Sequence, residues 1–227
     1  MDRRSAANHT DPAAGERLFD AVREAERFFM ATDAVHRALE KLVGLLAAGR
    51  IPYALVGAMA LNEYGYRRVT VDVDILLTRE GLEAFKRAHL GRGYLEKFPG
   101  SRGMRDTENG VNIDVVLAGE YPGDGKPKPV AFPDPATVAI EGARVRLLPL
   151  PKLIELKLAS GISAPDRLKD LADVQELIKA RPLRREFAEG LDPYVRGKFL
   201  ELFEAVEKSK SAEKCGTLRA LELHDEH

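Results

Sequence analysis

Two aspartates, Asp72 and Asp74, interrupt an otherwise apolar stretch of the sequence, VTVDVDILL at residues 69–77. Valine, isoleucine and leucine favour a buried strand, whereas aspartate is depleted in strands and is costly to bury alone. Side chains two positions apart in a strand point the same way, so the two carboxylates project together. Such a pair forms the solvent side of an edge strand, a set of partners for arginines, or a cation site.

A third aspartate, Asp114, lies in a second apolar stretch, GVNIDVVL at residues 110–117. If the two strands are neighbours, three carboxylates converge, and their repulsion raises their pKa values. Magnesium ions take carboxylate oxygens together with substrate phosphates. Two such ions can hold the attacking and leaving oxygens of a phosphoryl displacement. We therefore predict a site for Mg²⁺, as two ions and with Mn²⁺ as a substitute, at Asp72, Asp74 and Asp114.

A small-residue turn precedes the aspartate strand. In LVGAMA at residues 55–60, Gly57 lies where a short buried strand (53–57) meets a helix (58–64). The free N–H groups at a helix N-terminus favour phosphate, Gly57 allows close approach, and Ala58 is small. The alternative is an ordinary transition from strand to helix, where glycines are common.

Lys157 lies on the inward stripe of a predicted helix at residues 151–160, in line with Leu153 and Ile154. A lysine in that position extends to solvent or meets an acid, for which Asp170 is the candidate. Alternatively, it reaches a cleft and binds phosphates as a point charge. The periodicity alone leaves both alternatives open.

The elements that position these residues follow from hydrophobic periodicity. Helices are expected at residues 15–30, from Thr32 or Asp33 to Ala48, and at 80–90, 166–180 and 192–208. Further strands are expected after the GRGY turn at 91–94 and as a hairpin about Glu141-Gly142. The Pro- and Gly-rich residues 118–135 are expected to form a loop.

This order predicts an α/β (α+β) fold, with a small mixed sheet, flanking helices and helices at both ends. We expect a flexible N-terminus (1–14), N-terminal helices (15–49), a core (50–150), a helical part (151–218) and a tail (219–227). The composition is typical of a globular protein, with 44% hydrophobic and 31% charged residues and a net charge of −1. This balance does not favour a nucleic-acid or membrane-binding protein.

The single cysteine, Cys215, excludes a disulfide framework and favours a reducing compartment. The first residues lack the apolar core of a secretory signal, and no apolar run is long enough to span a bilayer. We therefore expect a cytoplasmic protein without a membrane partner. The segment GDGKP at 123–127 is not a phosphate-binding P-loop, because Pro127 replaces the Ser or Thr and the glycine spacing differs.

The stretch VGAMALNEYGYRRVTVDVDILL (56–77), with NIDVV (112–116) downstream, resembles the nucleotidyltransferase superfamily that shares the DNA polymerase beta palm. RRVTVDVD, KLIELKLAS and DRLKDLADVQELI are similar to minimal nucleotidyltransferases and to abortive-infection toxins. The resemblance covers about residues 50–180. Ala58 stands where this family usually has a serine or a second glycine.

This resemblance implies transfer of a nucleoside monophosphate from an NTP to an acceptor hydroxyl, with release of pyrophosphate. Asp72 and Asp74 would then hold the metals, and Asp114 would ligate the metal nearest the acceptor and help to deprotonate it. The nucleotide-binding residues that it implies are Gly57, Ala58, Arg68, Thr70, Lys157 and Asp170. For Arg68, neutralising the acidic cluster is the alternative to contacting phosphate.

The resemblance leaves the acceptor open among tRNA, protein and a small molecule. A toxin of a toxin–antitoxin pair, with an antitoxin as partner, is the first expectation. The alternatives are a nucleotidyltransferase that modifies an antibiotic, and a weakly active nucleotide-binding regulatory module. The presence of all three aspartates argues against the regulatory module.

Overall fold

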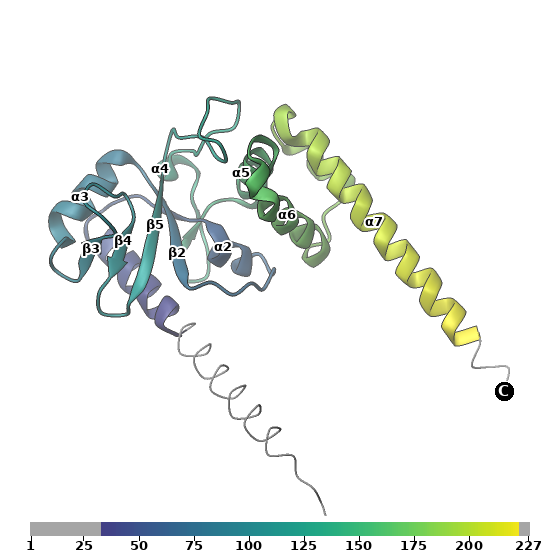
Figure 1. Ribbon diagram of the computed structural model, residues 1–227, viewed down its shortest axis with the longest axis horizontal. Coiled ribbons are helices and arrows are strands. Elements are labelled where there is room, and N and C mark those ends of the chain that lie inside the picture. The colour runs from purple at the N-terminus through teal and green to yellow at the C-terminus, as the bar shows by residue number, and fades with distance from the viewer. Residues whose placement is uncertain (1–32, 223–227) are drawn as a thin grey trace, which may run out of the picture.

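The computed structural model describes the backbone of residues 33–222 and the side chains of residues 33–212. Its strands and helices confirm the predicted class, a small mixed sheet with flanking helices (Figure 1). The helix predicted at residues 15–30 lies outside the described residues. Helical backbone is present from residue 33 to residue 48, as the sequence indicated.

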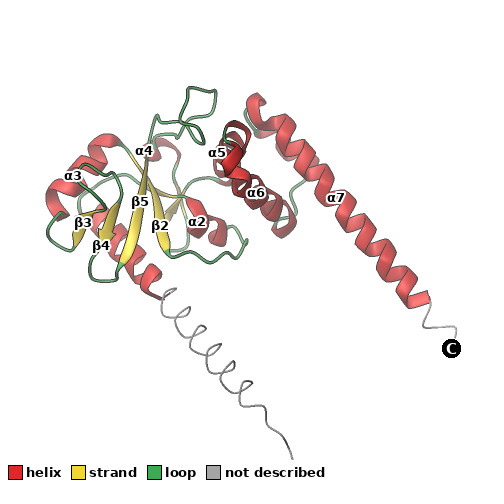
Figure 2. Cartoon of the chain, viewed as in Figure 1, coloured by secondary structure: helices red, strands yellow, loops and turns green. Residues whose placement is uncertain are grey.

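Within residues 33–222, a seven-stranded sheet forms the centre of the molecule (Figure 2). The strand order is β3-β4-β5-β2-β1-β7-β6. The strands are β1 (Ala54–Leu55), β2 (Asp72–Leu77), β3 (Tyr94–Glu96), β4 (Met104–Asp106), β5 (Val111–Leu117), β6 (Ile140–Glu141) and β7 (Arg146–Leu147). β2 and β5 run parallel at the centre, whereas β1 with β2 and β4 with β5 are antiparallel. The predicted hairpin about Glu141-Gly142 is the antiparallel pair β6 and β7.

Apart from the short helix at Pro135–Val138, which the sequence did not predict, the helices follow the predicted order. They are α2 (Gly57–Glu63), α3 (Arg79–His89), α4 (Pro135–Val138), α5 (Leu150–Ser163), α6 (Leu168–Ala180) and α7 (Pro193–Glu222), with short 3-10 turns at Pro165–Arg167 and Arg185–Gly190. Helices α5, α6 and α7 pack on one another at the end of the molecule away from β3 and β4 (Figure 1). No helix among the described residues is long and apolar enough to cross a membrane.

Several boundaries differ from those the sequence predicted, among them the start of β2 and the end of α7. The aspartate strand begins at Asp72 rather than at residue 69, and Val69 and Val71 are 55% and 60% exposed. Neither valine is part of the pairing between β2 and β5, which begins at Asp72, and their β propensity alone does not extend the strand. Helix α7 continues to Glu222, beyond the apolar stripe that predicted its end at 208, because Lys, Glu and Ala there are good helix formers.

A buried ion pair fastens the helix of residues 33–48 to the sheet. The side chain of Asp106, at the end of β4, is fully buried and accepts a 2.7 Å hydrogen bond from Lys41 Nζ. Asn109 and the backbone N–H of Glu108 also donate to Asp106. These donors outweigh the effect of burial and lower the pKa of Asp106. The sequence did not indicate this pair, because its members are far apart in the chain.

Candidate active site

The three predicted carboxylates lie on one face of the sheet, on its two central strands. Strands β2 and β5 pair in a register that places Asp74 opposite Asp114 and Asp72 opposite Asn112. Along both strands these polar residues alternate with fully buried apolar ones, such as Val73 and Ile113. The apolar face therefore builds the core and leaves the acidic face lining a cavity.

Asp74 interacts with the start of helix α2 and with both of the other carboxylates. It accepts a hydrogen bond from the backbone N–H of Ala58, in the first turn of α2. Burial and the charges of Asp114 and Asp72 together raise its pKa to about 6, although Lys157 and the Ala58 N–H lower it. The negative charge of Asp74 is therefore not fully compensated by its neighbours.

The turn at Gly57 packs closely against the side chain of Asp74. Gly57 has a φ of +63°, and a methyl group added to it would lie 2.0 Å from Asp74 Oδ2. Gly57 and Ala58 both line the cavity, and Gly57 packs closely against the Asp74 carboxylate. The small residues therefore bring the start of α2 against the acidic strand. The phosphate contact that the sequence predicts for these two residues stays a prediction.

Lys97, which the sequence analysis did not single out, contacts Asp114. Its Nζ lies 2.5 Å from Asp114 Oδ1, and it comes from the loop between β3 and β4. Asn112 donates a 3.1 Å hydrogen bond to Asp72 Oδ1. Asp72 and Asp114 thus have polar side-chain partners, whereas the donor to Asp74 is a backbone N–H. No local pattern pointed to Lys97, because its contact depends on how the β3–β4 loop folds over β5.

Lys157 lies on the opposite wall of the cavity, and it is 9% exposed. Its Nζ lies 2.9 Å from Asp170 Oδ1 and 2.7 Å from Asp173 Oδ2. Ser160 donates a 2.6 Å hydrogen bond to the other oxygen of Asp170. Burial raises the pKa of Asp170, but Lys157 and Ser160 outweigh burial and hold that pKa below its usual value. The ion pair considered from the sequence is therefore present, and Lys157 also lines the cavity.

Arg68 joins the same wall from the loop between α2 and β2. Its Nη1 donates to both oxygens of Asp173, at 3.0 and 2.8 Å. In this structure Arg68 thus pairs with Asp173 rather than with the three strand aspartates. Thr70 shapes the start of β2, because its hydroxyl donates to the carbonyl of Asp72 and accepts from the N–H of Asp72. Asp173 was missed from the sequence, although it lies one helical turn after Asp170.

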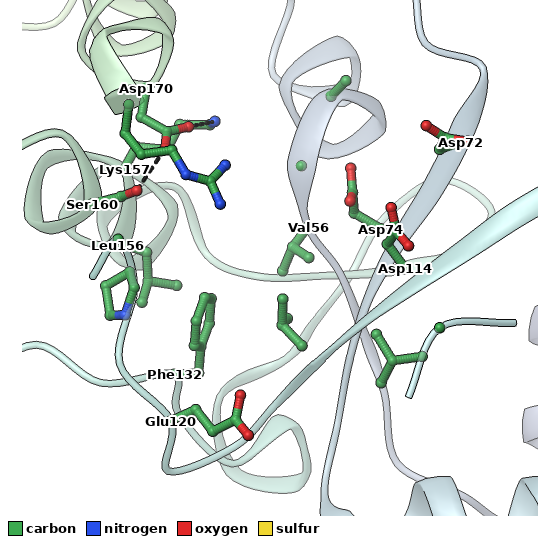
Figure 3. A pocket seen from close by; sticks show the side chains of 18 of the residues that line it. Val56, Asp72, Asp74, Asp114, Glu120, Phe132, Leu156, Lys157, Ser160 and Asp170 are labelled. Carbon is green, nitrogen blue, oxygen red and sulfur yellow. Dashed lines mark hydrogen bonds and ion pairs between the residues drawn. The ribbon is translucent and has the colours of Figure 1, made fainter. Parts of the chain in front are cut away.

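One cavity of about 920 Å³ brings these residues together. That volume falls in the range of small-molecule and cofactor sites. Figure 3 shows Lys157, Ser160 and Asp170 on one side of the cavity and the three aspartates on the other. The residues predicted from the sequence that line it are Gly57, Ala58, Arg68, Thr70, Asp72, Asp74, Asp114, Lys157 and Asp170.

The acidic face suits a hard cation in its chemistry, because carboxylate oxygens are the preferred ligands of Mg²⁺. Burial first, and then repulsion from Asp114 and Asp72, raises the pKa of Asp74, and a bound cation would favour its charged form against both. Among the side chains of residues 33–212, no cluster of three or more His, Cys, Asp or Glu has the arrangement needed to hold a metal ion. Lys97 already contacts Asp114, so a cation bound there would have to displace its ammonium group.

No protein-family model and no curated protein matches this sequence. The fold is similar to JHP933 from Helicobacter pylori, with 16% identity, 88% of this chain and 98% of that chain covered, and a TM-score of 0.43. A second H. pylori protein, proposed to be a nucleotidyltransferase, has 17% identity, 81% and 97% coverage and a TM-score of 0.45. The antibiotic-resistance factor ANT(2'')-Ia, in complex with adenylyl-2''-tobramycin, has 15% identity, 82% and 94% coverage and a TM-score of 0.35. Because these identities and TM-scores are low, the likenesses support no functional argument. The function is argued from the side chains that line the cavity.

Proposed function

We propose that this protein is a metal-dependent nucleotidyltransferase, which moves a nucleoside monophosphate from an NTP to an acceptor hydroxyl and releases pyrophosphate. The observation that supports it best is the pairing of Asp74 with Asp114 on neighbouring parallel strands, facing Lys157 across one cavity. A row of carboxylates opposite a cation suits a substrate that is itself a polyanion carrying metal ions. The sequence resemblance points to the same reaction.

Asp72, Asp74 and Asp114 are the residues that would hold Mg²⁺, which when bound neutralises charge on the phosphates. Lys157 and Arg68 would bind the non-transferred phosphates from the opposite wall, because both donate only and both line the cavity. The oxygen of the acceptor hydroxyl attacks the α-phosphorus, and the bond to pyrophosphate breaks. The side chain of Asp114 is 45% exposed and therefore accessible to an acceptor, whose hydroxyl proton it would accept.

The first experiment measures binding. Thermal melts with each of the four NTPs and Mg²⁺ are expected to show a higher melting temperature for at least one NTP, because a ligand bound only by the native state stabilises it. The Asp74→Asn protein should fold and should lose most of that gain. Absence of a shift with all four NTPs at millimolar concentration would count against the proposal.

The second experiment identifies the acceptor. The protein is incubated with each α-³²P-labelled NTP and, separately, with total RNA, with cellular protein and with aminoglycoside or lincosamide antibiotics. Label on RNA or protein would support a toxin, and co-expression with the neighbouring gene would then test for an antitoxin. Label on an antibiotic would support the small-molecule alternative. Binding of NTP without transfer to any acceptor would support a regulatory module.

A further inference from the structure

Asp173 is a buried carboxylate shared by two cations from different parts of the chain. It lies on α6, and its side chain is 2% exposed. Arg68 Nη1 contacts both of its oxygens, at 3.0 and 2.8 Å, and Lys157 Nζ contacts Oδ2 at 2.7 Å. Arg68 comes from the loop between α2 and β2, and Lys157 comes from α5. Asp173 therefore connects the sheet side of the cavity with the helical side.

The backbone of Arg68 is held independently of Asp173. Asn62, on α2, accepts a 2.6 Å hydrogen bond from the N–H of Arg68 and donates a 2.9 Å bond to its carbonyl. The guanidinium end is held by Asp173. Losing Asp173 would therefore leave the Arg68 backbone in place and release only its cationic end.

Lys157 is held from two directions. Asp170 contacts it at 2.9 Å and is itself bonded by Ser160, one turn along α5 from Lys157. Asp173 contacts the same ammonium group at 2.7 Å. Without Asp173, Lys157 would keep Asp170 but would lose the contact that aligns it with Arg68. The two cations would then repel each other with one fewer negative charge between them.

We propose that Asp173 is a positioning residue for the nucleotide: it holds Arg68 and Lys157 side by side, so that both meet the same phosphate chain. This inference rests on the proposed nucleotidyltransferase function. Long cationic side chains lose much rotamer freedom when they bind, and a partner that orders them beforehand removes that cost. Asp173 does not line the cavity, whereas both of its partners do, so it acts through them.

The direction in which Asp173→Asn changes nucleotide affinity distinguishes a positioning role from a simple effect of net charge. If only net charge mattered, Asp173→Asn would remove a negative charge near the phosphates and tighten nucleotide binding. If Asp173 positions the two cations, the same change weakens binding, by about tenfold, the equivalent of ordering one long cationic side chain at binding. The two expectations differ in direction as well as in size.

The test is a calorimetric titration of wild type and Asp173→Asn with the best-binding Mg²⁺–NTP and with inorganic tripolyphosphate, below the melting temperature of both proteins. Both probes should bind Asp173→Asn about tenfold more weakly, since the contacts that weaken are to phosphate. The control is Glu176→Gln, which removes one negative charge from the same helix at a half-exposed site and should bind both probes like wild type. Tighter or unchanged binding by Asp173→Asn would overturn the proposal, even if that protein is less stable.

A second variant covers the case in which Asp173→Asn does not fold. Asp173→Glu keeps the charge but moves the carboxylate by one methylene, so a positioning role again predicts weaker binding of both probes. Binding equal to wild type would refute that role. If wild type binds tripolyphosphate but no NTP, the proposed function fails. If wild type binds an NTP normally and neither variant changes that affinity, only the role of Asp173 fails.

Discussion

Gly57 and Asp74 are packed so closely that a methyl group on Gly57 would lie 2.0 Å from Asp74 Oδ2. Gly57 also has a φ of +63°, a backbone conformation that residues other than glycine rarely adopt. The backbone at the start of α2 and the carboxylate on β2 are therefore fitted to each other. Any residue with a Cβ at position 57 must move Asp74, the central carboxylate of the cavity.

Gly57→Ala is expected to cost about 2–4 kcal/mol of stability, from backbone strain together with displacement of Asp74. It should also reduce Mg²⁺-dependent NTP binding, because Asp74 no longer lies opposite Asp114. Urea melts and thermal shifts with Mg²⁺–NTP measure the two effects. The matched control is Gly65→Ala, since Gly65 has a φ of +89° but open space around it. Equal effects of the two changes on NTP binding would contradict the expected role of the Asp74 contact.

Asp74→Asn is expected to stabilise the metal-free protein at neutral pH. Burial and the neighbouring carboxylates raise the pKa of Asp74 from 3.8 to about 6. Between these values the folded state binds a proton that the unfolded chain has lost, so stability falls as the pH rises from about 4 to 6 and stays lower above pH 6. The variant should therefore gain about 2–3 kcal/mol at pH 7 and nothing near pH 4.

The measurement is a series of urea melts in EDTA between pH 4 and pH 8. Asp166→Asn is the control, because Asp166 is exposed in the turn between α5 and α6 and its removal should change stability little at any pH. A gain for Asp74→Asn that is independent of pH would show that the cost of ionising the buried Asp74 is not its source.

Lys157→Ala should reduce both stability and nucleotide affinity. Asp170 and Asp173 would lose a buried partner, and breaking such a pair costs about 3–5 kcal/mol. The loss should lie near 3 kcal/mol, because Ser160 and Arg68 remain bonded to the two carboxylates. Nucleotide binding should weaken by about 1.5–3 kcal/mol, the range of a charged hydrogen bond.

Urea melts and NTP titrations of the same Lys157→Ala protein separate these two roles. Lys179→Ala is the control, because Lys179 lies on α6 and both members of its pair with Glu176 are half exposed. That change should cost less than about 1 kcal/mol and leave NTP affinity intact. A large stability loss with unchanged NTP affinity would remove Lys157 from the nucleotide site.

Lys97→Met should strengthen metal binding. The Lys97 ammonium contacts Asp114, and it would compete with a cation for that carboxylate. Because the pair is partly exposed, its loss should change stability by less than about 1 kcal/mol. Calorimetric titration with Mg²⁺ should show a lower Kd for Lys97→Met than for wild type. A weaker affinity would mean that Lys97 assists the bound ion instead of competing with it.

Local sequence patterns were sufficient to predict the main strands and helices and to select the candidate site residues. Alternating apolar residues identified β2 and β5, helical periodicity identified α5 and α6, and the spacing of Asp72 and Asp74 predicted that they share a face. These properties depend on backbone geometry over a few residues, which is the same in any fold. The same reasoning failed at Val69 and Val71, which have high strand propensity but are exposed and lie outside β2.

The composition and these patterns thus determined a mixed α/β protein with an acidic strand pair. Tertiary structure alone decided that Asp74 faces Asp114 across a parallel register, that Gly57 packs closely against Asp74, and that Asp173 joins Lys157 to Arg68. Arg68 and Asp173 are 105 positions apart in the chain. Contacts over such separations depend on how whole elements pack, and several partners of suitable charge are available to each residue until the packing selects one.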